Sequence, residues 1–249
     1  MGSEKIFFNS QSGFRLCGRM FSGEKKTGKG LIFSHGLFST KDGYKITRMA
    51  DTIVEAGYDL LTYDFSYAGE SGGTLADISI LKSLEDLESA VDFFRGLGYK
   101  EIHLMGSSMG GAVSTLYAGK HPRVPASLIS IATPLDLKAL YADNMQIKDV
   151  SSLPDDGFSV LDGIAIKNSF FKEISGVDMT EVIHSIRCPV LIIHGKKDAI
   201  VSFGNTGLFI DNLHAPYKTL FIENGDHNLT QDAELELIKK EISEWLNAF

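Results

Sequence analysis

The chain has 249 residues, 43% of them hydrophobic, which suits one large globular domain or a domain with an insertion. A formal net charge of −8 argues against binding to nucleic acid or to an anionic membrane surface. No apolar run approaches the roughly 20 residues that a membrane-spanning helix needs, so no membrane span is expected. The two cysteines, Cys17 and Cys188, fit no metal-binding spacing, and we expect buried free thiols.

The N-terminus lacks a basic stretch followed by an apolar one, and this pattern favours a cytoplasmic protein without a signal peptide. The sequence leaves the oligomeric state open, a homodimer included.

Strand patterns and helix patterns alternate along most of the chain. Short apolar runs that suit strands occur at 6–8, 16–21, 31–34, 58–63, 101–105, 128–131, 190–194 and 220–222. Apolar residues at helical spacing predict helices over 44–56, 80–94, 109–120 and 233–246. This alternation implies the α/β fold class, with a mostly parallel central sheet and helices on both of its faces.

One stretch breaks the alternation. Residues 132–189 separate two predicted strands and are too many for a simple crossover. We therefore expect a core of residues 1–133 and 188–249 with residues 134–187 inserted as a cap, which includes a short helix over 164–174. An insertion above the carboxyl ends of the strands could act as a lid, and the alternative is a surface elaboration with its own small core.

The most informative chemical feature is a serine between an apolar strand and a helix. Ser108 stands at the centre of Gly-Ser-Ser-Met-Gly, residues 106–110. A serine on such a sharp turn projects from the sheet edge, where a histidine can take its proton. Ser71 lies in a similar pentapeptide that opens into a glycine-rich loop and not a helix. Ser108 is therefore the predicted nucleophile.

Seven histidines compete for the role of the base. His227 follows the last predicted strand, in a loop that can place a side chain over the strand ends, and it is the predicted base. His35 and His194 each end a strand, and we expect them to shape loops. The positions of the others suit structural or surface roles: His103, His121, His184 and His214.

A catalytic histidine needs an acid that holds it in the correct tautomer. Asp198 is the predicted acid because it follows the penultimate strand, which neighbours the final strand in space. The alternative acid is Asp136, after the strand that follows the nucleophile. Asp226 is adjacent to His227 and is expected to point away from it.

The negative charge of a tetrahedral intermediate must be met by backbone N–H groups. Met109 supplies one predicted donor because it follows the nucleophile at a helix N-terminus, where the helix dipole also helps. Leu37, just after His35 and Gly36, is the predicted second donor.

Taken together, these landmarks resemble the α/β-hydrolase superfamily over almost the whole chain. The residues that carry the resemblance are His35-Gly36, the turn at 106–110, His194-Gly195 through Asp198, and Gly225-Asp226-His227. The short insertion is similar to that of small-capped carboxylesterases such as cinnamoyl and feruloyl esterases, and monoacylglycerol lipases and serine aminopeptidases are similar too. The resemblance implies hydrolysis through an acyl-enzyme, without a metal or other cofactor.

The sequence thus predicts a serine carboxylesterase acting on small aromatic or short- to medium-chain acyl esters. Apolar residues of the insertion are the predicted substrate pocket: Tyr141, Phe158, Phe170 and Phe171. The alternatives are the same triad acting on an amide, a thioester or a carbon–carbon bond, and a binding protein that kept the fold without the activity.

Overall fold

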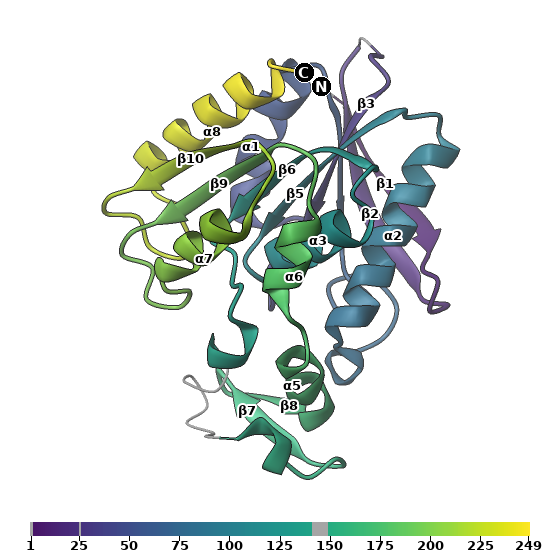
Figure 1. Cartoon of the computed structure of the whole chain (residues 1–249). Helices are drawn as coiled ribbons and strands as arrows, with labels where there is room; N and C mark the ends of the chain where they lie inside the picture. Colours follow the sequence, from purple (N-terminus) through teal and green to yellow (C-terminus); the bar gives the residue numbers. More distant parts are fainter. Residues whose placement is uncertain (1, 25, 141–148) are drawn as a thin grey trace.

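The computed structural model describes residues 2–24, 26–140 and 149–249 (Figure 1). Within these residues, eight strands form one sheet: β1 (Gly2–Asn9), β2 (Arg15–Ser22), β3 (Lys29–Ser34), β4 (Asp59–Tyr63), β5 (Glu101–Ser107), β6 (Pro125–Ile131), β9 (Val190–Gly195) and β10 (Tyr217–Ile222). The strand order is β1-β2-β4-β3-β5-β6-β9-β10. Strand β2 pairs antiparallel with β1 and with β4, and the other neighbours pair in parallel. The sheet confirms the predicted fold class.

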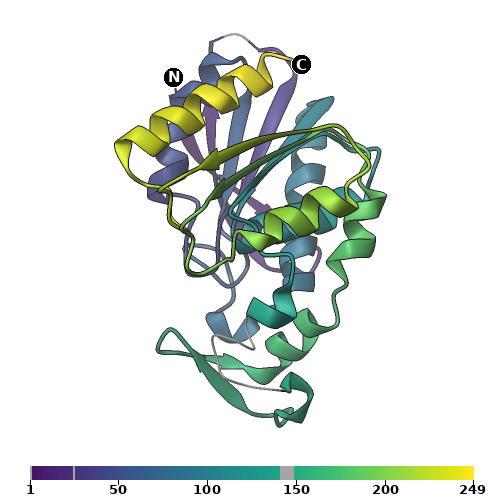
Figure 2. The same ribbon diagram turned by 60° about the vertical axis from the view of Figure 1, so that its left-hand side comes forward.

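Helices cover both faces of this sheet (Figures 1 and 2). The α-helices whose two ends both lie in the described residues are α1 (Tyr44–Glu55), α2 (Ile80–Gly96), α3 (Met109–Lys120), α5 (Asn168–Ser175), α6 (Met179–Ser185), α7 (Gly204–Asn212) and α8 (Asp232–Leu246). Helices α1 and α8 pack together on one face. On the other face α3 contacts both α2 and α6, and α6 contacts α7. None of the described helices has the length and apolar character that would let it cross a membrane.

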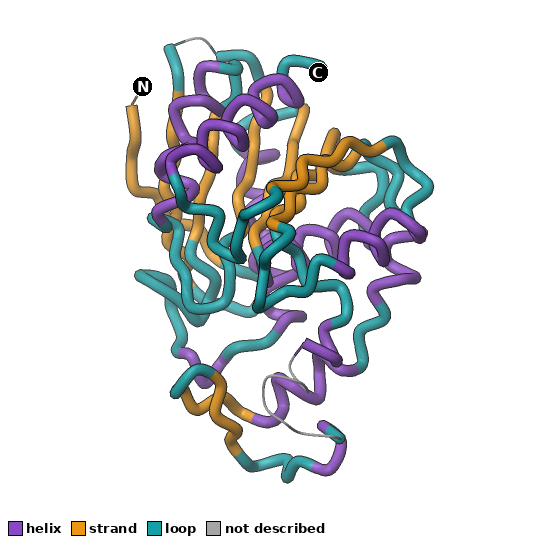
Figure 3. Tube along the Cα trace, turned by 90° about the vertical axis from the view of Figure 1, so that its left-hand side faces the viewer, coloured by secondary structure: helices purple, strands orange, loops and turns teal. Residues whose placement is uncertain are grey.

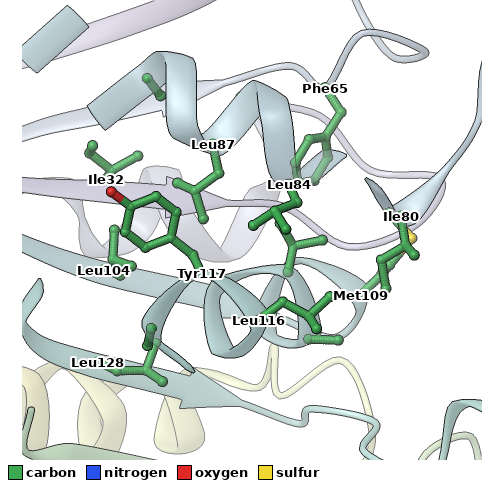
Figure 4. Close-up of a cluster of buried hydrophobic side chains, with 14 of the residues drawn as sticks. Ile32, Phe65, Ile80, Leu84, Leu87, Leu104, Met109, Leu116, Tyr117 and Leu128 are labelled. Carbon is green, nitrogen blue, oxygen red and sulfur yellow. The ribbon is translucent and has the colours of Figure 1, made fainter. Parts of the chain in front are cut away.

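The larger hydrophobic core fills the space between the sheet and the α2–α3 pair (Figure 4) and continues into the inserted segment. Leu84 and Leu87 of α2 meet Tyr117 of α3 over Ile32 and Leu104 of the two central strands. The helical spacing of the apolar residues in α2 explains this packing, because residues three or four apart share one helix face. Because both faces of the two central strands are buried, the carboxyl ends of these strands are held in fixed positions.

In the inserted segment, the helix begins later than the sequence predicts. Residues 164–167 form strand β8 (Ile164–Lys167), which pairs antiparallel with β7 (Phe158–Leu161), and the helix begins only at Asn168. Asp162 and Gly163 form the two-residue turn, with φ of 49° and 79°. An Asp-Gly pair with both φ values positive is the turn that best suits a two-residue hairpin, and that turn signal outweighs the apolar spacing.

The hairpin and α5 lie apart from the sheet, beyond the carboxyl ends of its strands (Figures 1 and 3). The short 3-10 helix η2 (Val150–Ser152) contacts α5 in the same region. Helix α6 ends the insertion and packs on α3 and α7, so the last part of the inserted segment lies against the sheet-covering helices.

Two glycines permit the turn between β5 and α3. A Cβ atom on Gly110 would lie 2.1 Å from the carbonyl oxygen of Ser34, and one on Gly106 would lie 2.2 Å from that of Gly110. Both contacts are with backbone atoms, which cannot swing away as a side chain can. The helix start can therefore approach β3 this closely only without side chains at these positions.

Replacing Gly110 with alanine should lower the free energy of unfolding by about 1–3 kcal/mol, because the added methyl group overpacks a rigid contact. Urea unfolding of both proteins measures the difference. Gly207→Ala is the matched control, since Gly207 lies in α7 with no atom within 4 Å of the added Cβ. It should leave stability unchanged or slightly raised. Equal stabilities for the two variants would contradict this account of the turn.

Candidate active site

Ser108 occupies the turn between β5 and α3 in a conformation that aims its side chain outward. Its φ of 53° and ψ of −124° lie outside the regions that non-glycine residues usually adopt. Such a conformation costs about 1–3 kcal/mol and persists only when the surroundings hold it. Here the Ser108 N–H donates to the Ile131 carbonyl oxygen at 2.9 Å, and the Ser108 carbonyl oxygen accepts from Gly111 and Ala112 at 2.8 and 3.1 Å.

His227 connects Ser108 to Asp198 through two hydrogen bonds. Its Nδ1 lies 2.7 Å from Oδ2 of Asp198, and its Nε2 lies 3.0 Å from Oγ of Ser108. A carboxylate can only accept, so Nδ1 carries the proton and donates it to Asp198. The lone pair of Nε2 then faces the Ser108 hydroxyl, which is the arrangement that a general base needs.

Asp198 is surrounded by N–H donors. Its Oδ1 accepts from the backbone N–H groups of Ile200 and Val201 at 2.9 and 2.7 Å, and its Oδ2 lies 3.2 Å from Nε2 of His194. Burial by itself would raise the pKa of Asp198, yet the hydrogen bonds from His194, His227 and Val201 hold that pKa well below its usual range. The carboxylate therefore stays ionised beside His227.

The competing residues have other partners. Oδ1 of Asp136 accepts from the Ala139 N–H at 2.8 Å, and Asp136 is exposed. Oδ1 of Asp226 accepts from two backbone N–H groups of its own turn at 2.9 Å. The Ser71 hydroxyl donates to the Asp64 carbonyl oxygen at 2.6 Å and accepts from the Cys17 N–H at 2.9 Å. These contacts tie each residue to local structure and not to His227.

The loop that follows β3 runs directly against the serine. A Cβ on Gly36 would lie 3.3 Å from Cβ of Ser108. Among the described residues, the backbone N–H groups of Leu37 and Met109 have no hydrogen-bond acceptor. Two free donors flanking the serine are what an oxyanion site requires, so their roles stay as the sequence predicts them.

His35 fixes this loop. Its Nε2 accepts from the Phe65 N–H at 3.1 Å, so its Nδ1 carries the proton and donates to the Gly36 carbonyl oxygen at 2.7 Å. Burial lowers the pKa of His35 to about 4, and the ring is neutral at neutral pH. His35 thus holds the segment that presents the Leu37 N–H, which agrees with the loop-shaping role expected from its position.

A cavity of about 400 Å³ opens beside Ser108 and His227. Most of its side chains are apolar: Phe33, Leu37, Phe38, Tyr44, Ile46, Leu140, Leu161, Ile200 and Val201. The inserted segment contributes Leu140 and the tip of the β7–β8 hairpin, Leu161 and Asp162. Among the described residues that line the cavity, Lys45 and Asp162 are the two of the lysine, arginine, aspartate or glutamate type.

Three of the predicted pocket residues, Phe158, Phe170 and Phe171, are not among the residues that line this cavity. Tyr141 lies outside the described residues. Phe158 is 59% exposed on β7, whereas Phe170 and Phe171 are fully buried in the larger core cluster. The correction has a physical cause, since the amphipathic helix α5 turns both phenylalanines toward the core on which it packs.

Two polar residues at the site, His194 and Lys45, have contacts that the sequence does not predict. Nε2 of His194 lies 3.0 Å from the Val201 carbonyl oxygen, as its expected loop-shaping role requires, and it also lies 3.2 Å from Oδ2 of Asp198, four residues further along the chain. Lys45 gives no local signal, because a lysine in an amphipathic helix usually lies on the solvated face. In the described part of the chain, no group of three or more His, Cys, Asp or Glu side chains could hold a metal ion.

Fold and site together define a hydrolase of the α/β type. A profile of the alpha/beta hydrolase fold matches residues 30–160, more than half of the chain. The chain therefore belongs to the alpha/beta hydrolase fold family, as its landmarks predicted.

Known proteins show the same relationship. Palmitoyl-protein thioesterase ABHD10, mitochondrial, from Rattus norvegicus is 27% identical over 218 residues, which cover 84% of this chain and 72% of that protein. The ferulic acid-bound structure of Est1E from Butyrivibrio proteoclasticus has a TM-score of 0.87 at 22% identity, and 97% of each chain is covered. Mouse alpha/beta hydrolase domain-containing protein 10 has a TM-score of 0.79 at 23% identity, covering 98% of this chain and 99% of that one.

Ser108→Ala should abolish turnover of an activated ester and labelling by a fluorophosphonate, since both need the Ser108 oxygen as nucleophile. Labelling on a gel and a p-nitrophenyl ester assay measure the two effects. Ser71→Ala is the matched control and should keep appreciable activity, because the Ser71 hydroxyl only bridges two backbone groups. An inactive Ser71→Ala beside an active Ser108→Ala would reverse the assignment.

Asp198→Asn should lower kcat by up to about 10⁴, because an amide no longer enforces the histidine tautomer that accepts the serine proton. Steady-state kinetics on the same ester measure the loss. Asp136→Asn serves as the comparison, and it should leave kcat near that of the unmodified protein because the asparagine oxygen can accept from the Ala139 N–H as the aspartate oxygen does. Similar losses in both variants would speak against Asp198 as the acid.

Proposed function

We propose that this protein is a serine carboxylesterase that hydrolyses small aromatic or short- to medium-chain acyl esters. The observation that carries the proposal is the hydrogen-bonded series Ser108–His227–Asp198, which opens on an apolar cavity. A binding protein that kept the fold without the activity would not require a strained serine beside a correctly oriented histidine.

In the proposed reaction, Oγ of Ser108 attacks the ester carbonyl carbon while Nε2 of His227 takes the hydroxyl proton. The backbone N–H groups of Leu37 and Met109 hold the resulting oxyanion. His227 then returns the proton to the departing alcohol, and the acyl group stays on Ser108. A water molecule attacks next, gives one proton to His227, and releases the acid as that proton passes back to Ser108.

The cavity sets the size of the substrate. A volume of about 400 Å³ lies toward the lower end of the range usual for small-molecule sites, about 300–1,000 Å³. Its apolar walls suit an aromatic ring or a chain of moderate length. The bound ferulic acid of the structurally similar Est1E supports an aromatic acyl group.

A thioester is the second candidate bond, because the similar protein from Rattus norvegicus carries the name palmitoyl-protein thioesterase. The same serine, histidine and oxyanion donors serve both bonds, since the leaving atom alone differs.

The proposed cap is the segment 134–187, which contributes Leu140 and Leu161 to the cavity wall. A cytoplasmic location stays a prediction of the sequence.

Matched p-nitrophenyl esters and acyl thioesters, with acyl chains from acetyl to palmitoyl, test the proposal. We expect kcat/KM to rise with chain length by up to about fourfold per methylene, which corresponds to about 0.8 kcal/mol, and to fall once the cavity is full. Ser108→Ala protein measures the background rate. Cleavage confined to palmitoyl thioesters would overturn the carboxylesterase assignment in favour of the second candidate, and absence of all ester and thioester cleavage would overturn both.

A further inference from the structure

Lys45 places a positive charge in the cavity that contains the proposed nucleophile. It lies in the first turn of α1, and its Nζ donates to Oγ of Ser107 at 3.2 Å. The side chain lines the cavity together with Ser108 and His227. Any substrate whose carbonyl reaches Ser108 must therefore come near this ammonium group.

The ammonium of Lys45 lacks an anionic partner. Among the described residues, no carboxylate oxygen lies within 4.0 Å of its Nζ, and the one hydrogen bond to Ser107 leaves two of its three protons uncommitted. Lys41, four residues earlier, shows the contrast. Its buried ammonium pairs with Asp42, Asp64 and Glu70 at 2.8–3.2 Å.

Lys45 is also poorly placed for helix stability. The first turn of a helix carries the positive end of the helix dipole, where a cation is disfavoured, and the first turn of α1 holds no acidic residue. Burial lowers the pKa of Lys45 to about 8, although the charges of Asp198, Asp226 and Glu234 act in the opposite direction. A bound anion would offset both the unfavourable position of the ammonium in the helix dipole and the cost of its burial.

We infer that Lys45 is a specificity-determining residue that binds a carboxylate carried by the ester substrate close to its scissile bond. This inference rests on the proposed esterase function. Apolar walls would hold the hydrocarbon part of such a substrate, and the Lys45 ammonium would replace the water lost by its carboxylate. A charge-assisted hydrogen bond of this kind discriminates strongly, because an ester without the carboxylate leaves the ammonium unpaired in the cavity.

Asp162 supplies a matched control of opposite charge. It lines the same cavity from the tip of the β7–β8 hairpin and forms no ion pair within the described residues. A carboxylate at the cavity wall should repel an anionic substrate. Asparagine tolerates the positive φ of 49° at this turn, so Asp162→Asn removes the charge and keeps the hairpin.

The test compares kcat/KM for paired esters that differ in one charge. For a carboxylate on the acyl side, the pair is the p-nitrophenyl ester of glutarate and that of monomethyl glutarate. For a carboxylate on the leaving group, the pair is the acetate ester of 4-hydroxybenzoate and that of its methyl ester. Each pair gives an anionic-to-neutral ratio, measured at pH 7 for the unmodified protein and for Lys45→Met, Lys45→Arg and Asp162→Asn.

We expect Lys45→Met to lower the ratio by at least about tenfold for one pair, which identifies the side that carries the carboxylate. Lys45→Arg should restore most of the ratio, and Asp162→Asn should raise it. A ratio unchanged in Lys45→Met, or an equal loss on both members of each pair, would show a structural role and overturn the inference. If Lys45→Met does not fold, an unchanged ratio in Asp162→Asn overturns it.

Failure of the proposed function is a separate outcome. It would appear as an unmodified protein that cleaves neither the neutral nor the anionic ester, whereas failure of the inference alone would leave the neutral esters cleaved.

Discussion

The hydrogen bond between Asp198 and His227 is the interaction on which the site depends. It fixes which ring nitrogen carries the proton, and thereby gives Ser108 an acceptor for its own. The backbone N–H groups of Ile200 and Val201 hold the other carboxylate oxygen in place. Hydrogen bonds from His194, His227 and Val201 keep the pKa of Asp198 low although its side chain is completely buried. The loop after β9 thus orients the base in a second loop, after β10, because the two strands are parallel neighbours.

The sheet imposes a second constraint through contact distances. Helix α3 begins so close to β3 that the elbow accepts only glycine at positions 106 and 110, and this closeness also brings the Gly36 loop against Ser108. One packing requirement therefore sets both the strained serine and the proposed oxyanion donors beside it. The buried core of α2 and α3 supplies the stability that offsets the strain at Ser108 (Figure 4).

The sequence predicted the sheet, most of its helices and the positions of Ser108, Asp198 and His227, because these residues follow strands whose ends a parallel sheet must gather at one edge. The pocket was a different problem. The apolar character of Phe170 and Phe171 suggested a substrate pocket, but it carried no information on whether they would line a cavity or fill the core, where both are buried. The sequence prediction lacks the hairpin because the apolar residues of 164–174 suggest a helix, and the turn signal Asp162-Gly163 just before them was not weighed against that spacing.

Local sequence patterns do not predict the proposed role of Lys45, because that role depends on the missing anionic partner of its ammonium. A helix lysine usually reaches water, and nothing within α1 distinguishes this one. Only the folded chain reveals that Lys45 lines a largely apolar cavity together with Ser108, and that no carboxylate of the described residues lies within ion-pair distance of its ammonium. In such surroundings a charge acts more strongly than it would in water, so this one lysine can weigh more in substrate choice than the many apolar contacts around it.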